Sequence, residues 1–239
     1  ALNNISFKVR QGEVVGIAGV DGNGQKELAE AIHGLRPVTS GQIILDGIDI
    51  TNKKPKEVID TGLGHIPEDR HKTGLVLDFS IAENMVLENF DKEPYTKKYI
   101  YNPDIVKDFS YKLVEEFDVR CPGVETLVRS LSGGNQQKVI LAREISRSPK
   151  LLIAAQPSRG LDVGATEFVQ KRLIEERTEG KGVLLISTDL DEVLAVSDRV
   201  LVIYEGQIMG EINPSQAIFE EVGLLMAGTR QENSEGSEQ

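Results

Sequence analysis

Residues 131–138 read Leu131-Ser132-Gly133-Gly134-Asn135-Gln136-Gln137-Lys138, and an apolar-periodic segment follows them as far as Ile145. Serine is a favoured N-cap, and glycines leave the backbone N–H groups of a first helical turn uncovered. Because the dipole is positive at that end, the stretch predicts a helix whose N-terminus faces an anion. Read alone, Ser-Gly-Gly is also typical of an ordinary capped helix, so the rest of the chain has to distinguish the two.

A glycine-rich turn and two apolar runs accompany this stretch. The turn, Gly19-Val20-Asp21-Gly22-Asn23-Gly24, joins an apolar run at residues 14–18 to a helical pattern at residues 28–32. Glycine lets backbone N–H groups close around phosphate oxygens because no Cβ is in the way. The second run, residues 151–155, ends in Gln156-Pro157-Ser158-Arg159-Gly160-Leu161-Asp162. Short apolar runs bounded by turn residues predict buried strands.

At these three points, in this order, the sequence resembles the ATP-binding cassette (ABC) family of transport ATPases, with its phosphate loop, LSGGQ-type signature and GLD turn. The resemblance covers nearly the whole chain. It implies an α/β fold of the P-loop NTPase type, with a mixed/parallel core sheet, an antiparallel β edge and an inserted helical subdomain. The ATP-binding core lobe is expected to combine residues 1–70 and 151–230. The helical subdomain with the signature is expected at residues 71–150.

Composition limits the classes of partner. Lysine and arginine number 27 against 38 acidic residues, a net charge of −11, which opposes binding to nucleic acid phosphates. The single cysteine, Cys121, has no disulfide partner within the chain and is expected to be a semi-buried small side chain. No apolar run approaches the ~20 residues that span a bilayer, and no signal peptide is recognised at the start. Any membrane role is therefore expected to come through a partner.

The ends of the chain carry two further expectations. The first residue is not Met and a strand-like pattern begins at once, so we expect a piece of a longer protein. In the resembling family an aromatic residue that stacks on adenine lies before this point. At the other end, the polar composition of residues 231–239 predicts a disordered tail.

The remaining segments predict a mixed arrangement. Alternation at Ile5, Phe7 and Val9, followed by residues 13–18, predicts two strands that lead into the glycine loop. Residues 40–50 predict two short strands joined by a turn, residues 183–187 a strand, residues 203–209 a hairpin, and residues 216–227 a helix. Residues 71–130 are helical and charged in pattern, with a loop expected at residues 93–103. Within them the apolar positions 106, 109, 113 and 117 form one helical face.

The phosphate loop departs from the pattern G-x-x-x-x-G-K-[ST]. The glycines are kept, but Gln25 takes the lysine position and Lys26 the hydroxyl position. Lys26 does not replace the missing charge, because one residue along a helix turns a side chain by about 100°. Glu27 adds a carboxylate near the expected phosphates. The candidate cofactor-binding residues of the loop are Gly19, Asp21, Gly22, Asn23, Gly24, Gln25, Lys26 and Glu27.

Two readings of this loop remain open. The retained glycines favour weak ATP binding through backbone amides, whereas the lost charges favour a simple strand-to-helix turn. Magnesium binding at this site is doubtful for the same reason, and no metal ligand is assigned.

The catalytic positions that the resemblance implies are also altered. Ala155 stands where the family has a magnesium-binding aspartate, and Gln156 stands at the position of the base, which an amide cannot replace. Thr188 stands at the position of the switch histidine. Glu68 occupies the glutamine position of the magnesium-sensing switch, which is a feature of the sugar and nucleoside branch; a solvated loop is the alternative. The three histidines, His33, His65 and His71, lie elsewhere and are expected to be structural.

The signature keeps what the family needs in order to act in trans. In the family two cassettes pair head to tail, and the signature of one completes the ATP site of the other. Ser132, Gly133, Gly134 and Gln136 are present here, as is Asp162 of the GLD turn. Loss of a phosphate-charge stabiliser costs about 10²- to 10³-fold in rate, and loss of a base about 10²- to 10⁴-fold. We therefore expect a cassette that completes a partner's site while its own hydrolysis is impaired.

The resemblance implies a particular kind of ATPase. The altered residues are most similar to the second, C-terminal nucleotide-binding domain of a sugar or purine-nucleoside importer. Its partners are then the N-terminal cassette of the same polypeptide, or another cassette, and membrane permease subunits that hold it at the cytoplasmic face. The groove near residues 71–95 is where the family receives a permease helix. Two alternatives stay open: a soluble, non-transport ABC ATPase, and a structural or regulatory cassette that binds no nucleotide.

Overall fold

A computed structural model describes residues 2–229 of the 239-residue chain, so the tail expected at residues 231–239 lies outside the described residues. Six strands form one sheet in the order β10-β9-β1-β8-β7-β4. Neighbours from β9 to β4 are parallel, whereas β10 is antiparallel to β9. Their bounds are β1 Val14–Ala18, β4 Leu63–Ile66, β7 Leu151–Ala155, β8 Gly182–Ser187, β9 Arg199–Tyr204 and β10 Gln207–Ile212.

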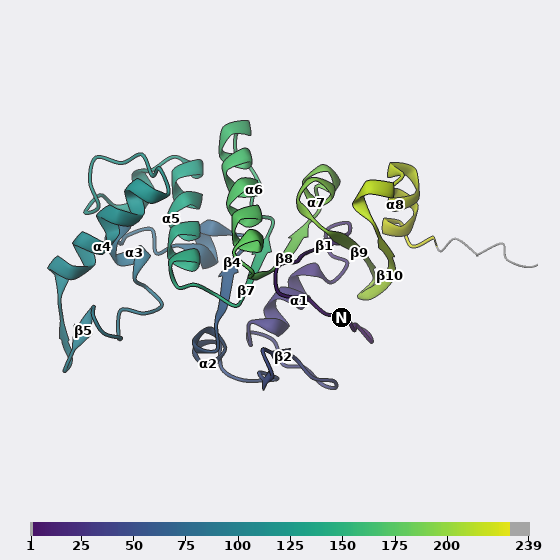
Figure 1. Ribbon diagram of the computed structural model, residues 1–239, viewed down its shortest axis with the longest axis horizontal. Helices are drawn as coiled ribbons and strands as arrows, with labels where there is room; N and C mark the ends of the chain where they lie inside the picture. The colour runs from purple at the N-terminus through teal and green to yellow at the C-terminus, as the bar shows by residue number, and fades with distance from the viewer. Residues whose placement is uncertain (1, 230–239) are drawn as a thin grey trace, which may run out of the picture.

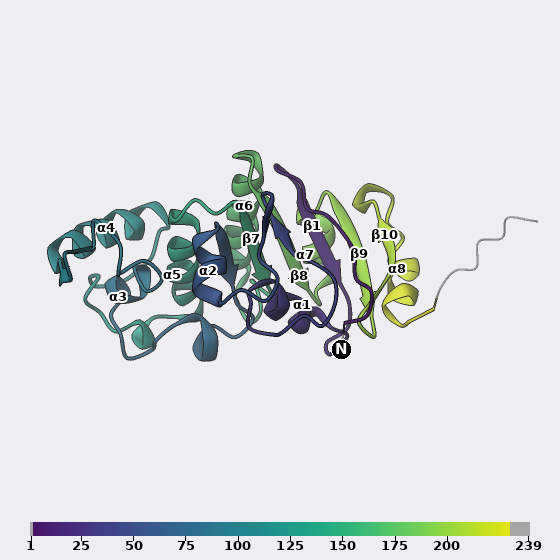
Figure 2. The ribbon, with the colours of Figure 1, turned by 90° about the horizontal axis from the view of Figure 1, so that it is seen from below.

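Helices cover both faces of this sheet (Figure 1). Strands β1 and β8 are buried along their whole length, as expected for parallel strands between two helical layers. One layer contains α5 (Gly133–Ser146), α6 (Val163–Thr178) and α7 (Leu190–Val196), and the other contains α1 (Gln25–Ile32) and α2 (Pro55–Asp60). Figure 2 shows α1 and α2 on the near side of the strands. Because side chains alternate along a strand, Val14 packs into the first layer and Val15 into the second.

The far end of the molecule is helical. Helices α3 (Ile81–Met85) and α4 (Pro103–Glu116) lie at the end opposite α8 (Phe219–Met226) in Figure 1. The predicted face of α4 is confirmed, since Val106, Leu113 and Phe117 are buried and Phe109 is partly buried against the core. Single helical turns occur at Arg70–Gly74, Val128–Ser130 and Pro214–Gln216. No helix within residues 2–229 combines the length and the apolar character needed to cross a membrane.

Two small hairpins complete the fold. The predicted pair at residues 40–50 is confirmed as β2 (Ile44–Leu45) and β3 (Ile48–Asp49). The loop expected at residues 93–103 is wrong in part, because β5 (Thr96–Lys97) and β6 (Ile100–Tyr101) form a second hairpin there. Its turn residues Lys98 and Tyr99 both have positive φ, at 48° and 67°. The sequence did not indicate this turn, because turns with positive φ usually contain Gly, Asn or Asp.

The strand predicted at residues 5–9 is wrong, because the backbone of residues 2–9 pairs with no neighbouring strand. Its alternation is nevertheless real, since Ile5, Phe7 and Val9 pack in part against the core layer of α1. The alternation therefore correctly predicted which side chains point toward the core. The predicted strand does not form, because no neighbouring strand forms backbone hydrogen bonds with this segment. The C-terminal predictions hold, with β9 and β10 as a hairpin and α8 as a helix slightly shorter than expected.

A cluster of buried charges anchors the C-terminal half of α5. Glu144 is fully buried and accepts hydrogen bonds from Arg143 Nε at 2.7 Å, Arg147 Nη1 at 3.1 Å and the backbone N–H of His65 at 3.1 Å. Arg147 also pairs with Glu88 and donates to the carbonyls of Ile59 and Leu63. Burial and the neighbouring Glu144 charge raise the pKa of Glu88 to about 7. This cluster joins α5 to β4, to the end of α2 and to the segment after α3.

We predict that the stability of the chain depends on pH through Glu176, which lies on the buried side of α6. Burial, with repulsion from Glu179, raises the pKa of Glu176 from 4.5 to about 7. A carboxyl group whose pKa is higher in the folded than in the unfolded state stabilises the fold when it is protonated. This contribution is fully present below the pKa of the unfolded state and is lost as pH rises through the pKa of the folded state. Glu176→Gln should therefore gain about 1–2 kcal/mol relative to the wild type between pH 5 and pH 8. Urea unfolding at both pH values measures this, and Glu167→Gln, exposed on the same helix, is the control.

Candidate functional site

The glycine loop lies between β1 and α1, with Gly22 and Gly24 in left-handed conformations at φ 87° and 111°. Gly24 is the N-cap of α1, and no side chain caps that helix. Among residues 2–229, no acceptor is recorded for the backbone N–H groups of Gly22, Gly24, Gln25 or Lys26. The loop thus presents unpaired donors at a helix N-terminus, the arrangement that binds an anion.

Neither of the first two side chains of α1 places a positive charge inside the glycine loop. Gln25 is buried, and its Nε2 donates to the carbonyl oxygen of Gly19 at 2.8 Å, so the amide closes the loop from within. The side chain of Lys26 is 71% exposed and its Nζ lies 3.9 Å from Glu30. The donors that point into the loop itself are therefore backbone amides at the positive end of α1, and the Lys26 side chain extends to the surface.

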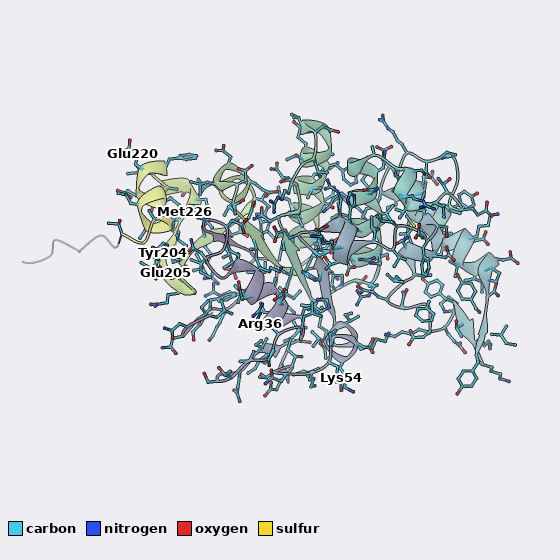
Figure 3. The ribbon with its side chains drawn as sticks, turned by 180° about the vertical axis from the view of Figure 1, so that it is seen from behind. Arg36, Lys54, Tyr204, Glu205, Glu220 and Met226 are labelled. Carbon is cyan, nitrogen blue, oxygen red and sulfur yellow. The ribbon has the colours of Figure 1, made fainter. Side chains whose placement is uncertain are left out.

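Asn23 ties the loop to the turn between β9 and β10. Its Oδ1 accepts from the N–H of Glu205 at 3.1 Å, and its carbonyl oxygen accepts from the N–H of Gly206 at 2.8 Å. Figure 3 shows Glu205 in that turn, beside Tyr204 at the end of β9. The N–H of Asn3 donates to the carbonyl of Gly206 at 2.8 Å, so the N-terminal segment holds the same turn. Because a trans peptide directs its C=O and N–H oppositely, the anchored carbonyl of Asn23 turns the N–H of Gly24 away from the hairpin.

We expect Asn23→Ala to loosen this attachment. It removes the Oδ1 acceptor and leaves the N–H of Glu205 without its side-chain partner, which costs about 1 kcal/mol. Hydrogen exchange at the amide of Glu205 should become about 5- to 10-fold faster, because 1.4 kcal/mol corresponds to a factor of ten. Asn23→Asp keeps an acceptor oxygen of the same reach and should keep wild-type exchange. Equal protection in Asn23→Ala would contradict the attachment.

Gln156 and Thr188 meet at the ends of β7 and β8. Gln156 has φ 48°, and its Oε1 accepts from the N–H and Oγ1 of Thr188, each at 3.3 Å, and from Ser187 Oγ at 3.4 Å. Nearby, burial raises the pKa of Glu192. The amide of Gln156 is thus held by the β8 end and offers no basic group.

A small cavity of about 20 Å³ lies between Gln156 and the glycine loop, with room for about one water molecule. Magnesium prefers carboxylate, phosphate and water oxygens. The side chain of Ala155 offers no oxygen there, and Glu68 is paired with Arg159. Asp21 supplies a second carboxylate to the cavity. No group of three His, Cys, Asp or Glu in the described part of the chain is arranged to hold a metal ion, so few of the oxygens that magnesium prefers come from these side chains. The residues lining the cavity are Asp21, Gln25, Lys26, Glu68, Ala155, Gln156 and Ile186.

The signature stretch begins α5, away from that cavity. Ser132 is the exposed N-cap of α5, and its Oγ accepts from Asn135 Nδ2 at 3.0 Å and from the Asn135 N–H at 3.5 Å. Gln136 was predicted to bind a cofactor, but its side chain is buried and donates from Nε2 to the Val128 carbonyl at 3.2 Å. Its Oε1 lies 2.8 Å from His71 Nε2. Gln136 thus supports the helix start from inside the chain.

The switch segment and the GLD turn are in contact. Glu68 forms an ion pair with Arg159, and Asp162 caps α6 by accepting from the N–H of Ala165 at 2.8 Å. Arg70 donates from Nη1 to the Arg159 carbonyl at 3.1 Å. Sequence reasoning did not single out Arg70. The only signal for Arg70 in the sequence was its position two residues after Glu68, because the residues that Arg70 contacts are distant in the sequence.

The other two histidines belong to the core. The rings of His33 and His65 lie 4.7 Å apart, and burial lowers the pKa of both, that of His65 to about 3. Both are therefore neutral at physiological pH and pack between α1 and β4, as expected for structural residues.

A strand, a glycine loop with unpaired amides and a helix at the carboxyl edge of a parallel sheet are the arrangement of a nucleotide-binding α/β protein. The family model described as "ABC transporter" matches residues 2–159, and the chain belongs to this family. In this family a transporter subunit hydrolyses ATP, which is bound with Mg²⁺. The predicted fold class is thereby confirmed.

Three relatives of this chain are named as ATP-binding proteins of importers. The chain is 52% identical over 233 residues to the guanosine import ATP-binding protein NupO of Bacillus subtilis (strain 168), covering 98% of this chain and 46% of that protein. It is 52% identical over 227 residues to the nucleoside import ATP-binding protein NupA of Lactococcus lactis subsp. cremoris (strain MG1363), covering 95% and 45%. A ribose import ATP-binding protein, RbsA of Bacillus licheniformis, is 41% identical, covering 96% and 46%. The chain thus spans less than half the length of these relatives.

Solved structures show the same fold. A nucleotide-free ATP-binding cassette from an ABC transporter superposes with a TM-score of 0.76 at 24% identity, covering 95% of this chain and 89% of that one. A dimeric bacterial ABC transporter cassette superposes with a TM-score of 0.75 at 21% identity, covering 89% and 90%.

Proposed function

We propose that the chain is a cassette of an ABC importer for nucleosides or a related sugar, which completes a partner's ATP site with its signature while its own site is hydrolysis-impaired. The observation that carries this proposal is an asymmetry. The side chains around the glycine loop lack the charges for hydrolysis, whereas Ser132 and the two glycines after it form an exposed, capped helix start.

The impaired site rests on three local observations. Gln25 is a neutral amide that closes the loop, Ala155 supplies no ligand for magnesium, and Gln156 is held by Thr188. Each removes a group that stabilises charge or moves a proton in phosphoryl transfer. Nucleotide binding through the backbone amides alone is compatible with this set, and Mg²⁺ is then not held by the chain's own residues.

The site for the partner rests on the signature. Ser132, Gly133 and Gly134 offer a hydroxyl group and open amides at the positive end of α5, a helix of 14 residues. The candidate phosphate contacts in trans are these three residues, with Asp162 at the neighbouring turn. A dimeric structure bound to ADP and phosphate is known for a cassette of the same fold, which supports pairing as the working arrangement.

The transport role rests on the relatives. Two of them, each 52% identical, are named as nucleoside or guanosine import ATP-binding proteins, so we assign nucleosides as the cargo class. The partners are then permease subunits at the cytoplasmic face of the membrane and an N-terminal or separate cassette. We further propose residues 1–70 and 151–230 as the ATP-binding lobe and residues 71–150 as the helical lobe that carries the signature.

Calorimetric titration of the chain with ATP, with and without Mg²⁺, tests the altered site. We expect micromolar binding that is indifferent to Mg²⁺, because backbone amides supply the donors. Affinity that depends on Mg²⁺, or hydrolysis by the isolated chain at rates typical of the family, would falsify the impaired site. No binding up to millimolar ATP would favour the cassette that binds no nucleotide.

The second test is turnover of the paired assembly with Ser132→Ala. A signature that acts in trans should lose about 10-fold or more in kcat, since one hydrogen-bond donor to the developing charge is removed. Ser130→Ala, an exposed serine two residues upstream, is the matched control. Unchanged turnover in Ser132→Ala would favour a structural or regulatory cassette. Activity without permease subunits and with a nucleic acid partner would favour the non-transport ATPase.

A further inference from the structure

Residues 68–71 touch three functional segments that are far apart in the sequence. Glu68 lines the cavity next to the glycine loop and forms an ion pair with Arg159. Arg70 donates to the carbonyl of Arg159, and His71 Nε2 lies 2.8 Å from Oε1 of Gln136 in the first turn of α5. This short segment therefore joins the chain's own cavity, the turn before α6 and the signature helix.

Two glycines, one at the start of α5 and one in the turn before α6, face the guanidinium of Arg70. A Cβ on Gly133 would lie 3.3 Å from Arg70 Nη2, and a Cβ on Gly160 would lie 3.6 Å from the same nitrogen. Gly160 also has φ 69°, which favours glycine on its own. The planar guanidinium fits between these two backbones because neither carries a side chain.

The hydrogen bonding of Arg70 is incomplete. Its Nε is buried and has no hydrogen-bond partner among residues 2–229, while Nη1 is used by the Arg159 carbonyl. A buried, unpaired donor on a cation costs free energy. Stability alone therefore does not explain Arg70, whose contacts are with the start of α5 and with the turn before α6.

We propose that Arg70 is a positioning residue that fixes the signature loop relative to the Gly160-Leu161-Asp162 turn, so that both are presented to the partner cassette in one geometry. This inference rests on the proposed function of the signature.

Hydrogen exchange of the chain tests the positioning without using activity. The reporting amides are Gln136, bonded to the Ser132 carbonyl at 2.9 Å, and Leu161, bonded to the Ser158 carbonyl at 3.0 Å. In Arg70→Ala both should exchange about 10-fold faster, because the turn of Leu161 loses the hydrogen bond to the Arg159 carbonyl and the start of α5 loses the guanidinium next to Gly133. The amide of Leu28 in the first turn of α1 should not change. Faster exchange at all three amides would show general loosening and would overturn the proposal.

Two variants sharpen this test. Arg70→Lys keeps the charge but loses the planar fork, so its exchange rates should resemble those of Arg70→Ala. Rates nearer to the wild type would show that charge alone is sufficient, against the proposed role. Arg36→Ala is the matched control, because within residues 2–229 the side chain of Arg36 bonds to no group other than the carboxylate of Glu30. Figure 3 shows Arg36 at the surface.

Turnover of the paired assembly supplies a separate readout. Arg70→Ala should lower kcat about 10-fold and leave KM within about twofold, because the signature is misplaced and the nucleotide's own loop is intact. If Ser132→Ala lowers turnover and Arg70→Ala does not, the proposal on Arg70 is wrong. If Ser132→Ala has no effect, the function proposed for the signature is wrong, and the exchange rates still decide whether Arg70 positions the two loops.

Discussion

Gly134→Asp is expected to lower ATP turnover of the paired assembly by about 10²- to 10³-fold, the loss typical when a charge-stabilising donor is removed. The reason is electrostatic, because a carboxylate would stand among the open amides that we propose to face the partner's phosphate. It is also steric, because a Cβ on Gly134 would lie 3.1 Å from the Cβ of Ala165. Steady-state phosphate release by the assembly measures the change.

Folding does not explain this expected loss. An acidic residue in the first turn of a helix is favourable by about 0.3–1 kcal/mol, so α5 should form normally. Gly123→Asp is the control, since Gly123 lies in a loop where a Cβ would meet only Tyr111 Oη at 3.8 Å. Wild-type turnover in Gly134→Asp would show that the N-terminus of α5 does not face phosphate in the assembly.

Glu144→Ala is expected to destabilise the chain by about 3–5 kcal/mol, because it leaves buried positive charge without its partner. Burial opposes the charge of Glu144, but Arg143 and Arg147 outweigh it and keep the pKa of Glu144 below its ordinary value. The carboxylate also accepts the N–H of His65, which holds α5 to β4. Against a typical total of about 5–15 kcal/mol, such a loss is large. Urea denaturation at pH 7 measures it.

Two comparisons isolate the buried charge. Glu125→Ala removes one partner of the exposed pair with Lys107 and should cost less than about 1 kcal/mol. Glu144→Gln keeps the shape and an acceptor for His65 but removes the charge, so it should fall between the two. If Glu144→Ala costs no more than Glu125→Ala, the cluster does not stabilise α5.

Local patterns predicted the elements whose side chains and turns are specified within a few residues. The run at residues 151–155 became β7 because its side chains are apolar on both faces, and Ser132 became an N-cap because its hydroxyl reaches a backbone N–H three residues on. The hairpin of β5 and β6 was missed because Lys98 and Tyr99 carry no turn signal. The strand at residues 5–9 was predicted in error because alternation indicates burial and does not reveal whether a ladder partner exists.

The sequence by itself determined the α/β class, the motifs that resemble the ABC family and the residue types around the glycine loop, because each is read from local patterns of side chains. Only the tertiary structure decided how the retained groups are used. It placed Gln25 inside the loop, buried Gln136 against His71, and brought Arg70 between Gly133 and Gly160. The physical reason is that these contacts join residues from about 6 to 90 positions apart, and packing of the whole sheet and its helices sets which of them meet.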